Sequence, residues 1–98
     1  MILEIATLDV IPGREADFEQ DFATAESIIG SMQGHISHQL KRCLEKPSRY
    51  ILLVEWERLE DHTAGFRNSP EYQQWRKLLH HYYDPAPQVA HYSDVELN

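Results

Sequence analysis

The chain has 98 residues, a formal net charge of −7 and a pI near 5.2. This acidic balance argues against binding to nucleic acid or to anionic membrane surfaces, because both require basic faces. With 42% hydrophobic and 26% charged residues, the composition is that of a globular protein, so residues 1–98 are expected to form one domain. A chain this short buries a limited core, so oligomerisation is expected to add to its stability.

The cellular compartment is indicated by cysteine usage and by the N-terminal residues. Cys43 is the only cysteine, so no intrachain disulfide can form, and a reducing compartment is expected. Met1 is not followed by a basic segment and a long apolar segment, and no apolar run approaches the roughly 20 residues of a membrane-spanning helix. These features predict a cytoplasmic protein with no membrane partner.

The first half of the chain changes its hydrophobic period once. Residues 2–10 alternate and are rich in β-formers, which predicts a strand ending at the Pro12-Gly13 turn. Residues 14–32 carry one apolar stripe at helical spacing and acidic side chains near their start, which predicts a long helix. The stripe consists of Phe18, Phe22, Ala25, Ile29 and Met32.

The next two segments are expected to form a β-hairpin. Residues 35–44 alternate, with Ile36, His38 and Leu40 on one face, and a short Lys-Pro-Ser connection leads to residues 49–57. The second strand is apolar on one whole face and in the centre of the other. Because helices can cover only one of these faces, the other is expected to pack on the sheet of a second copy.

The last third is expected to contain a short helix, a longer helix and a strand. Residues 59–67 suit a short helix, Ser69 and Pro70 suit the start of the next one, and residues 88–95 suit a strand. The aromatic stretch 66–83 is interpreted as the helix that walls a pocket. The order β-α-β-β-α-β predicts a ferredoxin-like α+β sandwich with a four-stranded antiparallel sheet, forming a dimeric α/β barrel.

Several segments together carry a family resemblance. They are ATLDVIPGREADFEQDF at 6–22, VEWE at 54–57, DHTAGFRNSPEYQQWRKLL at 61–79 and the P-x-V-x-H-Y pattern at 87–92. This set resembles the antibiotic biosynthesis monooxygenase domain family, which includes quinol monooxygenases. The resemblance implies a homodimer and, for the type that oxidises polyketide rings, no metal or flavin cofactor. It also implies an electron-rich aromatic substrate whose anion passes an electron to dioxygen.

The haem-degrading branch of that family is a poorer match. The resemblance places Phe66 where that branch has tryptophan, Arg76 where it has the iron-binding histidine, and Ala6 near its asparagine. Arginine stays protonated and offers no neutral nitrogen to iron. Haem degradation is therefore disfavoured.

Four residues are candidates for catalysis. His62 has an intrinsic pKa suited to a general base, although it could also be a surface histidine beside Asp61. Tyr72 and Arg76 could hold the oxygens of a phenol or quinone. His38 is the alternative base if its strand face points inward, and otherwise a core histidine.

Four aromatic residues are candidates for binding the substrate, with plain core packing as the alternative for each. They are Trp56, Phe22, Phe66 and Trp75. No metal site is expected, because the adjacent histidines His80 and His81 point about 100° apart on a helix. No glycine-rich phosphate loop is present either, so no bound nucleotide or flavin is expected.

Two functions are compatible with these features. The first is a cofactor-independent monooxygenase that oxidises a quinol or polyphenol with dioxygen. The second is a non-catalytic dimeric module that binds a small aromatic molecule in the same pocket. The ferredoxin-like fold does not distinguish them, because it supports many unrelated functions.

Overall fold

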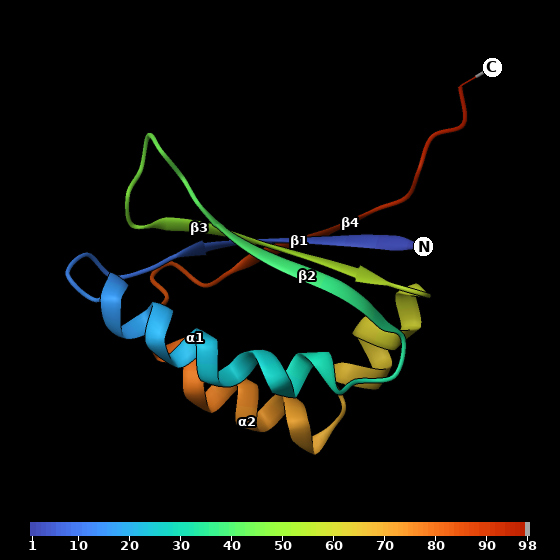
Figure 1. Cartoon of the computed structure of the whole chain (residues 1–98), viewed down its shortest axis with the longest axis horizontal. Coiled ribbons are helices and arrows are strands. Elements are labelled where there is room, and N and C mark those ends of the chain that lie inside the picture. The colour runs from blue at the N-terminus through green and yellow to red at the C-terminus, as the bar shows by residue number, and fades with distance from the viewer. Residues whose placement is uncertain (98) are drawn as a thin grey trace.

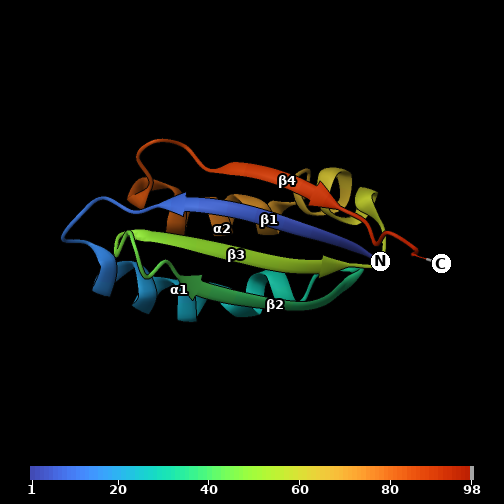
Figure 2. The same ribbon diagram turned by 90° about the horizontal axis from the view of Figure 1, so that it is seen from above.

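In the computed structural model, which describes residues 1–97, both long helices lie on one face of a four-stranded sheet (Figure 1). The strands are β1 (Ile2–Asp9), β2 (His35–Arg42), β3 (Arg49–Trp56) and β4 (Gln88–Tyr92). The helices are α1 (Glu15–Gly30), α2 (Pro70–Leu79), the π-helical η1 (Asp61–Phe66) and the 3₁₀ turn η2 (His80–Tyr82). Figure 2 shows the sheet order β2-β3-β1-β4, in which all neighbours are antiparallel. The ferredoxin-like prediction is confirmed.

Side chains alternate between the two faces of β1 and β3. Those that face the helices are buried, while those on the other face, such as Ile5 and Leu53, are partly exposed. The alternation on β1 places Glu4 among the buried, helix-facing residues together with Ala6 and Leu8. The sheet therefore brings one carboxylate into the apolar layer beneath the helices.

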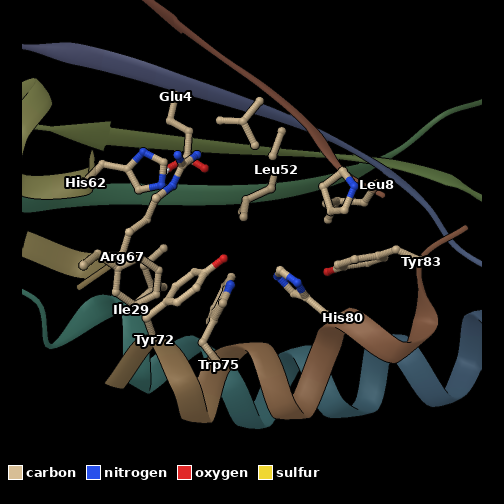
Figure 3. Close-up of a pocket in the computed structure, with 14 residues that line it drawn as sticks. Glu4, Leu8, Ile29, Leu52, His62, Arg67, Tyr72, Trp75, His80 and Tyr83 are labelled. Atoms are coloured by element: carbon tan, nitrogen blue, oxygen red, sulfur yellow. Dashed lines mark ion pairs between the residues drawn. The ribbon is translucent and has the colours of Figure 1, made fainter. Parts of the chain in front are cut away.

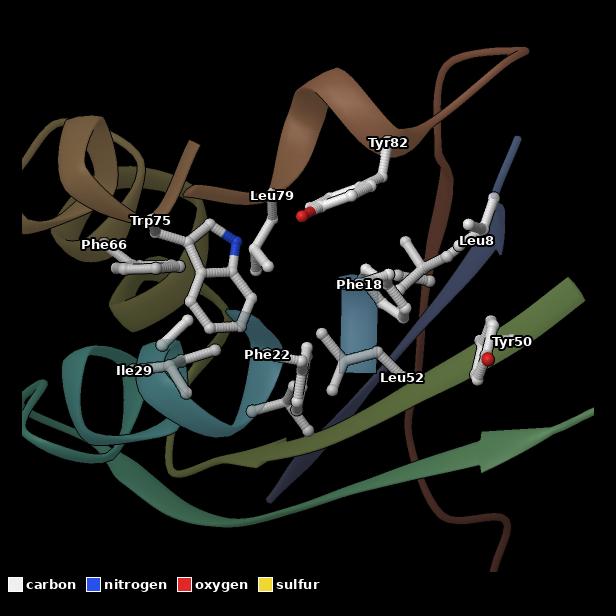
Figure 4. Close-up of a cluster of buried hydrophobic side chains, with 14 of the residues drawn as sticks. Leu8, Phe18, Phe22, Ile29, Tyr50, Leu52, Phe66, Trp75, Leu79 and Tyr82 are labelled. Carbon is white, nitrogen blue, oxygen red and sulfur yellow. The ribbon is translucent and has the colours of Figure 1, made fainter. Parts of the chain in front are cut away.

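The core combines aliphatic side chains with aromatic ones from the helices and the sheet (Figure 4). Phe22 of α1 meets Trp75 of α2 edge-on, with 5.7 Å between ring centroids. The start of α2 is set by Ser69, whose Oγ accepts a hydrogen bond of 3.1 Å from the Tyr72 N–H, and by Pro70, which has no N–H to satisfy. No helix within residues 1–97 is long and apolar enough to cross a bilayer.

A short helix followed by a second one starting at Ser69 and Pro70 is confirmed, so the aromatic stretch 66–83, described as the wall of a pocket, spans more than one helix. Phe66 ends η1, the extended Ser69 interrupts the chain before α2, and α2 gives way to η2 after Leu79. The expected strand 88–95 is also shorter, because β4 pairs only with β1. Tyr92 lies opposite Leu3, so residues beyond Tyr92 soon run out of partners on β1.

A β-bulge in β2 changes the expected faces of that strand. His35 pairs with Trp56 and Ser37 pairs with Glu55, so Ile36 is the additional, unpaired residue. Ile36 is consequently exposed, and His35 lies on the same side as His38. The prediction that Ile36 and His38 share a face is wrong because of this insertion.

The loop before β2 is tied to the start of η1. Gly34 has a φ of +86°, and a Cβ at this position would overlap the carboxylate of Asp61. Asp61 is itself buried and accepts a hydrogen bond of 3.1 Å from the Arg58 N–H. The Glu57 N–H in turn donates to the Gly34 carbonyl oxygen at 2.8 Å. These contacts fix the position of η1 and hence of His62.

Candidate functional site

A cavity of about 60 Å³ lies between the helix-facing side of the sheet and the segment that runs from η1 to β4. Such a volume holds about four water-sized molecules, at roughly 15 Å³ for each. Its walls are mostly apolar and aromatic, with polar groups at each end (Figure 3). The lining residues are Glu4, Ala6, Leu8, Ile29, Leu52, His62, Phe66, Arg67, Tyr72, Trp75, His80, Tyr83, Pro87 and Val89.

Glu4 is the buried carboxylate of the cavity. It is 5% exposed, and its Oε1 accepts a hydrogen bond of 3.0 Å from the indole N–H of Trp56. Burial raises the pKa of Glu4, while the Trp56 hydrogen bond and the positive charge of Arg67 act in the opposite direction. A carboxyl group with a raised pKa is better matched to proton transfer near neutral pH than an ordinary surface carboxylate.

His62 lies next to Glu4, and each of its ring nitrogens has a polar neighbour. Its Nδ1 is 2.8 Å from Nε2 of His91 on β4, and its Nε2 is 3.4 Å from Oε1 of Glu4. The ring also stacks on Trp56, with 5.5 Å between centroids and 17° between planes. Burial, with the nearby charges of Arg67 and His91, lowers the pKa of His62 to about 3. The ring is therefore neutral near pH 7, and its contact with Glu4 is not an ion pair.

The opposite end of the cavity carries His80 and Tyr83, and Tyr72 lies between the two ends. Figure 3 shows the hydroxyl groups of both tyrosines and the ring of His80 pointing toward the cavity. Burial raises the pKa of Tyr83, and burial together with Arg76 lowers the pKa of His80, so both side chains are neutral near pH 7. This end can bind a ligand oxygen by hydrogen bonds without adding charge.

Four of the eight residues singled out in the sequence line the cavity. His62 and Phe66 come from η1, and Tyr72 and Trp75 come from α2. Tyr72 meets Phe66 edge-on at 5.2 Å, and Phe66 meets Trp75 at 5.7 Å, so three aromatic rings form one continuous wall. The interruption between η1 and α2 is what turns these side chains toward the same space.

The other four residues lie elsewhere. Trp56 and Phe22 are buried behind the lining, Trp56 beneath His62 and Phe22 beneath Trp75. Arg76 is exposed on α2 and does not line the cavity. His38 is hydrogen-bonded to Glu26 of α1 at 3.0 Å, away from the cavity.

The sequence interpretation also missed lining residues that carry chemistry. Glu4 had a detectable signal, because it alternates with Ala6 and Leu8 in a strand whose other residues on that face are apolar. Arg67 follows the π-helical turn and is brought to the cavity by that turn, which no residue pattern indicated. Within residues 1–97, no three His, Cys, Asp or Glu side chains are grouped closely enough to hold a metal ion.

The family model for antibiotic biosynthesis monooxygenase matches residues 1–78. The chain belongs to the antibiotic biosynthesis monooxygenase family. Membership confirms the resemblance found in the sequence. His80, Tyr83 and His91 lie beyond the matched residues of this family.

Several similar proteins cover nearly the whole chain. The uncharacterized protein YczJ of Bacillus subtilis (strain 168) is 52% identical over 97% of this chain and 100% of its own. A Bordetella bronchiseptica protein assigned to the same family is 42% identical, with a TM-score of 0.93 and 97% of each chain covered. SnoaB, a cofactor-independent oxygenase from Streptomyces nogalater, has a TM-score of 0.83 over 98% of this chain and 94% of its own. At 17% identity, that likeness shows the shared fold alone.

Proposed function

We propose that the protein is a cofactor-independent monooxygenase that oxidises an electron-rich aromatic, a quinol or polyphenol, with dioxygen. The observation that carries this proposal is the cavity, in which aromatic walls meet groups able to bind and deprotonate a hydroxyl. Family membership supports the class of reaction. The oxygenase activity of the structurally similar SnoaB is consistent with it.

The reaction starts with loss of a proton from the substrate hydroxyl. The resulting phenolate passes one electron to dioxygen, and the phenoxyl radical and superoxide join to form a C–O bond on a ring carbon that carries hydrogen. The peroxide takes up one proton and then loses water, which leaves a quinone. The net change is substrate plus dioxygen to quinone plus water, so the proton taken at the start is returned. The protein must orient the ring, exclude bulk water and hold that proton.

The described residues can be assigned to these tasks. Phe66 and Trp75 offer ring faces and edges for the substrate, and Tyr72 offers a hydroxyl to a substrate oxygen. Arg67 takes the role that the sequence suggested for Arg76, because it is the arginine that lines the cavity and its charge favours a phenolate. The cavity is smaller than the roughly 300 Å³ of common ligand pockets, so we propose that the exposed Arg67 side chain swings outward to admit a ring.

Oxygen consumption with a panel of quinols and polyphenols tests this function. We expect at least one quinol to be oxidised, with one oxygen molecule consumed per quinone formed and no added metal or flavin. Tyr72→Phe should raise KM about tenfold, because one hydrogen bond to the substrate is lost. Binding of the aromatic without oxygen consumption would select the alternative, a non-catalytic binding module.

We also propose that the protein works as a homodimer through the sheet face that no helix covers. That face carries partly exposed Leu3, Ile5, Ile51 and Leu53, and Tyr92 at its edge is 53% exposed. Apolar side chains on an open sheet face are favourably buried by an identical face. Sedimentation at micromolar concentration should show the dimer, and Leu53→Glu should shift it to monomer; a monomeric wild-type protein would contradict the proposal.

A further inference from the structure

We infer that Glu4, and not His62, is the group that takes the proton from a ligand hydroxyl in this cavity. The inference rests on the proposed function, since it assigns the proton acceptor for a phenolic substrate. Its basis is the arrangement of Glu4, Trp56, His62, His91 and Arg67.

Both ring nitrogens of His62 already have partners. Nδ1 is paired with Nε2 of His91 at 2.8 Å, and Nε2 faces Oε1 of Glu4 at 3.4 Å. The ring face is covered by Trp56. A ligand hydroxyl therefore meets no free lone pair on His62, and geometry is the first requirement of a general base.

Glu4 has an oxygen to spare. Its contacts with Trp56 and His62 both go to Oε1, and no hydrogen bond among the described residues 1–97 uses Oε2. Glu4 lines the cavity although only 5% of its surface is exposed. Oε2 is thus available to a ligand hydroxyl, while Oε1 is held in place by the indole N–H.

The surrounding charges favour this exchange of a proton. The titratable groups near Glu4 are His62 of η1 at 3.4 Å, Arg67, and His91, which is its register partner on β4. The lining residue of α1, Ile29, is uncharged. In the transfer, the ligand O–H bond breaks and a new O–H bond forms on Glu4. The carboxylate becomes neutral and the ligand oxygen becomes an anion. One negative charge therefore stays in the cavity beside Arg67, and no net charge is created in a buried site.

Binding of 4-nitrophenol tests the assignment without any oxygen chemistry, because the ionised form of this phenol absorbs visible light. The spectrum of the bound ligand reports its ionisation. Calorimetry in buffers of different ionisation enthalpy reports the protons released to solvent. For the wild-type protein near pH 6 we expect a bound phenolate with no net proton release, because Glu4 keeps the proton.

Glu4→Gln is the test variant, since glutamine retains an oxygen for the Trp56 N–H but cannot hold the proton. We expect the ligand either to stay neutral or to ionise with release of about one proton to the buffer. Glu26→Gln is the matched control, because Glu26 also contacts a histidine that contacts a second histidine, but away from the cavity. This control should behave as the wild type.

The outcomes separate this inference from the proposed function. A Glu4→Gln protein that still binds the phenolate without releasing a proton would overturn the assignment and return the role to His62. If quinols are consumed with oxygen at the same time, the proposed function stands without it. If the wild-type protein neither binds nitrophenol nor consumes oxygen with any quinol, both the assignment and the proposed function are wrong.

Discussion

Two contact chains of side chains, each made of one glutamate and two histidines, approach Trp56 from different sides. In each, a carboxylate contacts one histidine, which lies 2.8 Å from a second histidine. One histidine of each chain packs on the indole, stacked at 5.5 Å in the first chain and edge-on at 6.0 Å in the second. The inner chain consists of Glu4, His62 and His91, and the outer chain consists of Glu26, His38 and His35.

The difference between the chains is their access to water. The side chain of Glu4 is 6% exposed, whereas that of Glu26 is 51% exposed. Burial raises the pKa of Glu4 and lowers that of His62 to about 3, and Glu4 lines the enclosed cavity, whereas Glu26 of α1 lies in open contact with solvent. The same kinds of side chain are thus suited to proton transfer at the inner site, where water is excluded, and not at the exposed outer one.

The largest expected contrast is in oxidation rate. Glu4→Gln should lower kcat by about 100-fold or more, since general base catalysis typically contributes this much, while Glu26→Gln should stay within about twofold of the wild type. Oxygen consumption with a quinol that the wild type oxidises is the measurement. Equal losses in the two variants would remove the functional distinction between the chains.

Replacing the shared tryptophan should disturb both chains and cost stability. Trp56 is fully buried, so Trp56→Phe leaves a cavity and removes the hydrogen bond to Glu4, for a loss of about 2–3 kcal/mol in the free energy of unfolding. Urea denaturation measures this loss. Leu44→Ala, at a residue 90% exposed, is the control and should change the value by less than about 0.5 kcal/mol.

Acid should weaken the fold through the inner chain. The pKa of His62 is about 3 in the folded protein against 6.5 ordinarily, so between these values the unfolded chain binds the additional proton. Unfolding becomes more favourable as the pH falls through this window, by up to about 1.4 kcal/mol per pH unit from this group. Denaturation between pH 7 and 4 should show a shallower slope for His62→Gln than for the wild type. A matching change in His38→Gln would show that the inner position is not special.

The smallest effects concern the two carboxylates themselves at neutral pH. Because the pKa of Glu4 is raised, the folded state binds its proton more tightly than the unfolded state does. At pH values where Glu4 is ionised, its buried charge therefore destabilises the fold. Glu4→Gln should therefore increase the melting temperature at pH 7. Glu26→Gln should lower stability by at most about 0.5 kcal/mol, because an exposed pair contributes little. A lower melting temperature for Glu4→Gln would contradict the cost assigned to this buried charge.

The order of the elements and most of the core followed from local patterns in the sequence. The stripe through Phe18 and Phe22 and the alternation of residues 49–57 each depend on neighbours in the chain, so they could be recognised there. The inner chain could not be recognised in this way. His62 and His91 are 29 residues apart, and Glu4 meets them only because β1 lies between β3 and β4.

The outer chain illustrates a second reason for the missed assignments. A one-residue bulge at Ile36 rotates His35 toward His38, and strict alternation would have kept these two side chains on opposite faces. Similarly, Arg67 reaches the cavity because η1 is π-helical, while the more conspicuous Arg76 points to solvent. Local backbone irregularities thus decided which of two similar residues belongs to the site.

The position of β4 at the edge of the sheet decides how often His91 is in place beside His62 and Glu4 is shielded from water. Within residues 1–97, β4 has five residues and lies at the edge of the sheet, with β1 as its one neighbour. Edge strands with few buried side chains open locally at a lower free energy than central strands. Each opening would carry His91 away from His62 and admit water to Glu4. The rate of amide hydrogen exchange along β4 would therefore report the fraction of time for which the cavity beside Glu4 is closed to water.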